Sequence, residues 1–240
     1  MPARSGRKAR HAQRAAPPAF DPCPPGQKGG RYQPLTEPEM EAIFDTALRL
    51  LADLGMGEVP DRLHADFLRM GAEAKGNRVT FAPSLTREAI DAAAKKFTLF
   101  GRDPARDIEV GGDRVYFGTG GAAVQTLDMG TGLYRPSTLR DLHDFTRLQD
   151  TLANVSWFTR CCIATDVPDN RDLDINTAYA LVKNTTKPTA TAFTIAAHVA
   201  PIVEMFDIAG GGEGSYRARP FLKAHISPVI SPMRYGEDAV

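Results

Sequence analysis

Cysteine is scarce in this sequence: Cys23, Cys161 and Cys162 are the three cysteines among 240 residues. So few cannot build the dense disulfide framework of a small secreted domain. Cys161 and Cys162 are chain neighbours, so a bridge between them would be strained. No two cysteines have the Cys-x-x-Cys spacing of a zinc site. We therefore expect free thiols, no bound metal and a reducing compartment, the cytoplasm.

Long apolar runs and an excess of charge of one sign are also missing. No apolar stretch approaches the ~18 residues of a membrane-spanning helix, so we expect no membrane partner. Lysine plus arginine and aspartate plus glutamate each number 29, which gives no general attraction for nucleic acid. The sequence also shows no paired-carboxylate motif, no metal-ligand spacing and no Ser/His/Asp arrangement, so the catalytic residues stay unknown at this stage.

The balanced charge conceals a basic N-terminal segment. Residues 1–31 hold seven lysines and arginines against one acid, Asp21. The segment is rich in Pro, Ala and Gly and has no helical or strand period, which is typical of a disordered tail. It lacks the apolar core of a secretory signal. A transit peptide, or an arm that binds nucleic acid or a membrane surface, is an alternative, and a solvated tail is the simpler interpretation.

Residues 32–136 are predicted to form an N-terminal α+β extension of helices and a β-meander. Thr36-Glu37-Pro38-Glu39 has the pattern of a capping box with an early proline, and apolar residues then repeat at helical spacing. Further helices are expected at about 61–70 and 84–96. Short extended runs follow, and they are separated by glycine-rich turns. These runs are expected at 98–100, 108–110, 115–117, 124–127 and 133–135.

Residues 137–240 alternate between helical and strand patterns. Ser137 and Thr138 with Asp141 predict the start of a helix. Strands are expected at 155–159, 189–195 and 221–226, with helices at about 172–183 and 199–209. Their starts are about as far apart as one βαβ unit is long, roughly 30 residues. The alternation predicts a parallel α/β architecture, either a closed barrel or an open doubly wound sheet. Because three strands do not complete either sheet, we expect an exposed apolar edge near 221–230.

Sites in both architectures form at the carboxyl ends of the strands. This rule selects the loop at 159–166, the segment at 196–198, and the residues from His225 to Tyr235. His225 is either a core histidine or a site residue, whereas His198 is expected to flank a helix. Cys161 and Cys162 are interpreted as small buried side chains rather than nucleophiles.

A glycine-rich stretch, Gly118-Thr119-Gly120-Gly121, invites comparison with a phosphate loop. It lacks the Lys-Ser/Thr of that motif and lies between two strands instead of opening a helix. We expect a flexible turn or a backbone segment that lines a pocket. Residues 184–188 precede the second strand, at the end opposite the expected site, and are interpreted as a structural turn.

Seven segments match, in order, the pattern of one known family. They are LLADLG (50–55), FTLFGRDP (97–104), FGTGGA (117–122), LDMGTG (127–132), RPSTLRDL (135–142), KNTTKP (183–188) and ISPMRY (230–235). The chain resembles the trimethylamine methyltransferase family, including the members without pyrrolysine that demethylate quaternary amines such as glycine betaine. Because the pyrrolysine position of the family lies in a later part of the chain, the branch stays open.

The resemblance implies the N-terminal part of a (β/α)8 TIM barrel preceded by a helical plus β-meander extension, in a protein about twice this length. It implies methyl transfer from a methylated amine to the cob(I)alamin of a separate corrinoid protein. On this view the chain itself binds no cofactor, its partners are the corrinoid protein and the amine, and we allow for a homo-oligomer. The alternatives are a truncated, non-catalytic amine- or partner-binding protein and a TIM-barrel enzyme of other chemistry.

Removing a methyl group from a quaternary ammonium mainly requires positioning, because the nitrogen is already a good leaving group. Aromatic faces hold such a nitrogen, and polar or cationic donors hold a carboxylate. We therefore expect Phe117, Phe193 and Tyr235 near the ammonium, and His225 and Thr165 near a carboxylate.

Overall fold

The computed structural model describes residue 21 and residues 24–30, 32–225 and 227–236. Most of the predicted tail at 1–31 therefore lies outside the described residues. The helices are α2 (Glu37–Asp53), α3 (Asp61–Arg69), α4 (Pro83–Ala92), α5 (Leu139–Asp150), α6 (Asn170–Asn184), α7 (Val199–Gly210) and α8 (Ser215–Ala218), with 3-10 turns η1 (Pro104–Arg106) and η2 (Ala196–His198).

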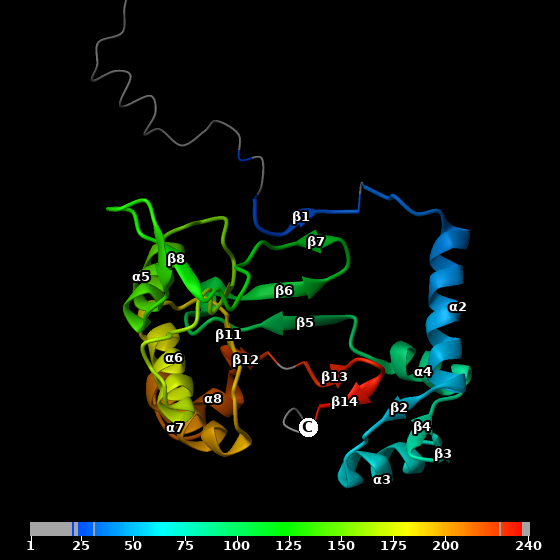
Figure 1. The fold of residues 1–240 in the computed structure, drawn as a ribbon. Coiled ribbons are helices and arrows are strands. Elements are labelled where there is room, and N and C mark those ends of the chain that lie inside the picture. The colour runs from blue at the N-terminus through cyan, green and yellow to red at the C-terminus, as the bar shows by residue number, and fades with distance from the viewer. Residues whose placement is uncertain (1–20, 22–23, 31, 226, 237–240) are drawn as a thin grey trace, which may run out of the picture.

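Helices α2, α3 and α4 lie around an antiparallel group of short strands at one side of the molecule (Figure 1). These strands are β2 (Met56–Gly57), β3 (Glu73–Lys75) and β4 (Arg78–Thr80). The capping box at the start of α2 is confirmed, since the Glu39 carboxylate accepts hydrogen bonds from the Thr36 N–H and hydroxyl, both at 2.8 Å. The helical stripe of α2 is only partly covered, because Leu48 is its one buried residue among those described.

Two-stranded pairs connect this region to the rest of the chain. They are β5 (Lys96–Leu99) with β6 (Ile108–Gly111), β8 (Gln125–Leu127) with β9 (Tyr134–Pro136), and β1 (Gln27–Lys28) with β7 (Arg114–Val115). Helix α4 ends at Ala92 rather than near Lys96, because Ala93 is extended and Lys96 already pairs with Gly111. Pairing also begins earlier than predicted, since β1 lies within the segment assigned to the tail.

The C-terminal part contains a parallel sheet with the strand order β10-β11-β12. The strands are β10 (Phe158–Thr159), β11 (Thr189–Thr191) and β12 (Leu222–Ala224), each shorter than predicted. Register pairs Phe158 with Thr189 and Thr189 with Leu222. Helices α5 to α8 gather on one side of the sheet (Figure 1), and the main core lies between them. That core includes Leu142, Phe158, Leu181, Ile202, Phe206, Phe221 and Leu222. The α/β class is thus confirmed.

The chain leaves the parallel sheet after β12 and returns to the N-terminal region. Strand β13 (Val229–Ile230) pairs with β14 (Arg234–Tyr235), and Arg234 pairs in parallel with Gly57 of β2. The Arg78 guanidinium donates to the carbonyls of Leu54 at 2.8 Å and Met233 at 2.7 Å. Val229 and Ile230 stay about half exposed, although their strand has a partner.

Candidate functional site

An open cleft lies at the carboxyl ends of the three parallel strands, where the strand-end rule places a site. Its volume is about 250 Å³. Each strand contributes to it, and so does the glycine-rich stretch. The lining residues are Gly121, Ala122, Thr159, Arg160, Ala192, His225 and Ser227.

The glycine-rich stretch runs beside the outer edge of β10. Gly118 and Trp157 form an isolated parallel bridge, and the Thr119 hydroxyl donates to the Thr159 carbonyl at 2.7 Å. A Cβ on Gly118 would lie 2.0 Å from the Trp157 ring, so only glycine allows this close approach. The prediction that this backbone lines a pocket is confirmed, since Gly121 borders the cleft.

Arg160 carries the one formal positive charge among the described lining residues. It follows β10, and its N–H donates to the Ala190 carbonyl at 3.0 Å. Burial lowers the pKa of its guanidinium, and the nearby Asp174 carboxylate opposes that change. Even so, an arginine keeps its proton at neutral pH. The cleft is therefore bordered by a partly desolvated, permanent cation.

Asp174 of α6 organises the neighbouring loop that follows β11. Its side chain is fully buried. The Oδ2 atom accepts from the Thr194 N–H at 2.8 Å and from the Thr194 hydroxyl at 2.7 Å, and it lies 2.8 Å from Nδ1 of His198. The Oδ1 atom is buried and has no hydrogen-bond partner among the described residues. His198 flanks α7 as predicted, and its position is fixed by this carboxylate.

The adjacent cysteines Cys161 and Cys162 lie beside the main core and differ in their surroundings. Cys162 is buried in the main core, and both described thiols are free. A hydrogen bond with Cys161, together with burial, raises the pKa of the Cys162 thiol above its usual value. A protonated, buried thiol is a poor nucleophile, so Cys162 agrees with the interpretation as a packing side chain. Cys161 packs against the same core, and the hydrogen bond with Cys162 lowers the pKa of its thiol.

The structure brings only one of the five residues predicted to bind substrate to the cleft. His225 lines it. Phe193 packs against the main core, and the Thr165 hydroxyl donates to the Ser137 carbonyl at 2.8 Å. Phe117 is half exposed and lies just before the glycine-rich stretch. Tyr235 is in β14, stacked on Phe67 with ring centroids 6.2 Å apart. A shared pocket of these five residues is therefore not formed in the described structure.

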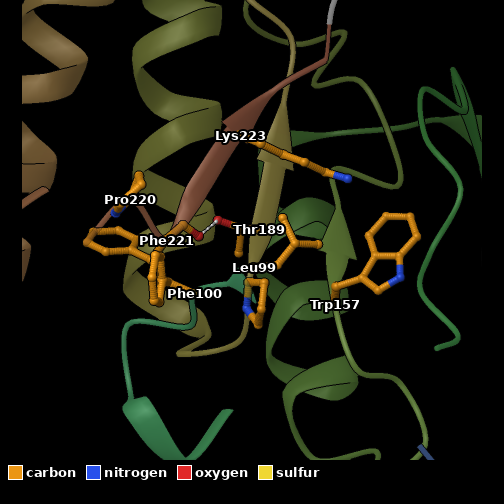
Figure 2. A pocket seen from close by; sticks show the side chains of 8 residues that line it. Leu99, Phe100, Trp157, Thr189, Pro220, Phe221 and Lys223 are labelled. Atoms are coloured by element: carbon orange, nitrogen blue, oxygen red, sulfur yellow. Dashed lines mark hydrogen bonds between the residues drawn. The ribbon is translucent and has the colours of Figure 1, made fainter. Parts of the chain in front are cut away.

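The opposite, amino-terminal end of the sheet holds a second cavity, which is too small for an amine. Its volume is about 20 Å³, near the size of one water probe. Figure 2 shows Phe100 beside Phe221 at one side, while Lys223 reaches toward Trp157, its Nζ atom 4.7 Å from the ring centroid. This end is closed by packing.

The segment 184–188 also lies at this closed end and acts structurally. The Lys187 ammonium is buried and donates to the carbonyls of Gln149 and Leu152, each at 2.8 Å. The Thr185 hydroxyl donates to Asp150 at 2.7 Å. These bonds fix the start of β11 to the end of α5, as expected of a structural turn.

Two important residues of this region were not singled out from the sequence. The strand-end rule selects the loop at 159–166 but does not distinguish Arg160 within it. The sequence of a loop does not show which of its side chains faces a cleft. Asp174 lies inside a helical pattern, where a carboxylate usually faces solvent. A buried-face position at helical spacing from Thr177, Ala178 and Leu181 was the available signal.

The described ranges contain no cluster of His, Cys, Asp or Glu side chains suited to hold a metal ion. The helices that the structure describes are all too short or too polar to cross a lipid bilayer.

Comparison with known proteins agrees with the motif resemblance. The family model for trimethylamine methyltransferase matches residues 3–240. A glycine betaine methyltransferase from Desulfitobacterium hafniense strain Y51 is 26% identical, over 88% of this chain and 44% of its own length. A trimethylamine methyltransferase from strain DSM 10664 / DCB-2 is 27% identical, over 83% and 40%.

The corresponding trimethylamine methyltransferase of Methanosarcina barkeri is 26% identical, over 85% of this chain and 42% of its own length. The chain thus spans less than half the length of these relatives, which are all named as methyltransferases. Because the family model covers nearly every residue, the chain belongs to the trimethylamine methyltransferase family of enzymes.

Proposed function

We propose that this chain takes part in methyl transfer from a methylated amine to the cob(I)alamin of a separate corrinoid protein. The observation that carries the proposal is the cleft at the carboxyl ends of β10, β11 and β12, in a chain of this family. The amine is trimethylamine or a quaternary amine such as glycine betaine, as in the names of the relatives.

The described residues support a role in positioning rather than acid–base chemistry. Gly121, Ala122, His225 and Ser227 line the cleft and are exposed at its surface, so a partner protein has access to a bound methyl group. Holding the reacting atoms in line lowers the barrier of a transfer without a side-chain base. The cobalamin is the methyl acceptor and belongs to the partner, and this chain contributes the amine site.

We further propose that this chain forms the first part of a (β/α)8 barrel. Three consecutive strands pair in parallel in chain order, as the first three strands of a (β/α)8 barrel do. On this proposal the remaining strands belong to the part of the relatives' length that this chain does not span.

The experiment is an absorbance assay for methylcobalamin. The protein is incubated with a corrinoid protein, a reductant and, separately, trimethylamine, glycine betaine, proline betaine or carnitine. We expect the methylcobalamin spectrum with at least one amine. If no amine gives that spectrum but one still binds, the chain is an amine-binding protein without turnover.

His225 offers a test of the site itself. A His225→Ala variant removes the one predicted substrate-binding side chain that lines the cleft. We expect weaker amine binding by calorimetry, by about 3- to 10-fold, if a typical hydrogen bond is lost. Tyr235→Phe is the matched control, because that ring packs in β14 against Phe67. Unchanged affinity in His225→Ala would remove this residue from the site.

A further inference from the structure

Arg160 differs from the partly buried arginines Arg135 and Arg219 in having no anion beside it. Arg135 is paired with Asp141 at 2.7 Å, and Arg219 is paired with Asp107. Among the described residues, no carboxylate oxygen lies within the 4.0 Å of an ion pair with Arg160. A guanidinium taken partly out of water is stabilised by a bidentate carboxylate or phosphate.

Asp174 is near but does not serve as that partner. Its Oδ2 atom is already shared among two donors of Thr194 and the His198 ring. Its Oδ1 atom stays without a hydrogen bond among the described residues. The Asp174 carboxylate therefore fixes the loop after β11. The Arg160 guanidinium has no carboxylate partner in the part of the chain that the structure describes and is able to bind an anion from a ligand.

The rest of the cleft suits an anion better than an ammonium group. Its other described lining residues are small, neutral ones and His225. None of the aromatic faces that usually hold a quaternary nitrogen lies among them. An unpaired guanidinium repels such a nitrogen at close range. This wall of the site therefore matches the negative end of a substrate.

We propose that Arg160 binds the carboxylate of the methylated amine, so that the substrate is a betaine-type amino acid rather than trimethylamine or an amino alcohol. This inference rests on the proposed function and names its substrate class. The carboxylate would lie in the cleft against Arg160, and the methylated nitrogen would point away from β10.

The test uses three probes that separate the two charges of a betaine. Glycine betaine carries both charges. 3,3-Dimethylbutyrate has the same shape and the carboxylate but no positive charge. Choline keeps the quaternary nitrogen and has no carboxylate. Binding of each probe is measured by isothermal titration calorimetry on the wild-type protein and on Arg160→Gln, Arg160→Lys and Arg217→Gln. Arg217 is an exposed arginine of α8 away from the lining residues and serves as the control.

We expect the wild type to bind glycine betaine and 3,3-dimethylbutyrate more tightly than choline. Arg160→Gln should weaken both carboxylates by about 10- to 100-fold, the range for a charged hydrogen bond, and leave choline unchanged. Arg160→Lys should restore part of that affinity, because it keeps the charge without the bidentate geometry. Arg217→Gln should behave like the wild type.

The outcomes separate this inference from the proposed function. Equal wild-type affinity for choline and glycine betaine, or unaltered carboxylate binding in a folded Arg160→Gln, overturns the inference alone. If Arg160→Gln does not fold, the wild-type preference among the three probes still decides. Arg160-dependent carboxylate binding without methylcobalamin from any amine rejects the methyl transfer but not the anion site. Loss of all three probes equally in Arg160→Gln indicates a structural role and also overturns the inference.

Discussion

The helices of the N-terminal region are buried far less than helix α6, which packs beside the parallel sheet. None of the described residues of α3 and α4 is buried, and α2 buries one. Helix α6 by contrast buries residues around its circumference, from Asp174 to Val182, because it packs against α5, α7 and the sheet. Helices α2, α3 and α4 have one apolar face and few packing partners, whereas α6 carries its buried residues around its circumference, as expected of a helix with partners on several sides.

The two regions are consequently held together by different interactions. The parallel region has a continuous apolar core, with Leu181, Ile202 and Phe206 almost fully buried. The N-terminal region relies on short strand pairs and on Arg78, which bonds carbonyls from two distant chain segments. Stability should therefore be concentrated around β10 to β12, where the cleft is built. A site supported in this way keeps its geometry while the outer region opens locally.

The largest expected effect comes from truncating a leucine in each region. Leu181→Ala in α6 removes a fully buried side chain and should lower the free energy of unfolding by about 3 kcal/mol. Leu50→Ala in α2 removes a side chain that is 47% exposed and should lower it by less than about 1 kcal/mol. Urea unfolding of both variants measures the difference. Equal losses would show that α2 is as well packed as α6, contrary to the comparison.

An intermediate effect is expected where the C-terminal hairpin meets the N-terminal strands. Arg78→Met removes the bonds to Leu54 and Met233 and should lower stability by about 2 kcal/mol. Hydrogen–deuterium exchange should quicken at Gly57 and Arg234 and stay slow in β10 to β12. The control is Arg114→Met, which removes a hydrogen bond to Glu109 of β6, away from the hairpin of β13 and β14. Faster exchange throughout the parallel sheet would mean that the two regions unfold as one.

The sequence predicted the order of the main elements better than their lengths. Local signals located α2, α5, α6 and α7, since caps and apolar spacing act within one helix. The strands around Phe158 and Leu222 proved shorter than the apolar runs that predicted them. The return of Arg234 to β2 could not be foreseen, because it joins residues far apart in the chain and leaves no local pattern.

The location of the candidate site could likewise be predicted better than its individual side chains. The strand-end rule depends only on strand direction, and it selects the loop of Arg160 and the position of His225, both of which line the cleft. It could not tell which side chains of those loops turn toward the cleft. Phe193 and Tyr235 follow or lie near the correct segments, yet Phe193 packs in the core and Tyr235 in another sheet. Aromatic residue type alone does not separate a binding face from a packing face.

The smallest expected effect is at the junction of the two regions, where Asp141 opens α5. Its carboxylate accepts two bonds from Arg135, at 2.7 and 2.8 Å, and two from Thr138. Arg135 is the main cause that holds the pKa of Asp141 well below its usual range. A lowered pKa in the folded state stabilises the fold above the unfolded pKa, near 4, and this stabilisation declines as the pH falls below it.

Asp141→Asn should therefore lower the free energy of unfolding by about 1 kcal/mol at pH 7, and the difference from wild type should narrow below about pH 4. Urea unfolding at pH 7, 4 and 3 measures this. The control is Asp144→Asn on the same helix, whose exposed ion pairs with Arg140 and Arg147 are weakened by salt. Its effect should be smaller and should vanish at high ionic strength, whereas that of Asp141→Asn should persist because the Asp141 carboxylate is only 12% exposed. If the loss of unfolding free energy in Asp141→Asn did not change with pH, Asp141 would stabilise the helix only by its capping geometry. The ion pair with Arg135 would then not contribute to stability.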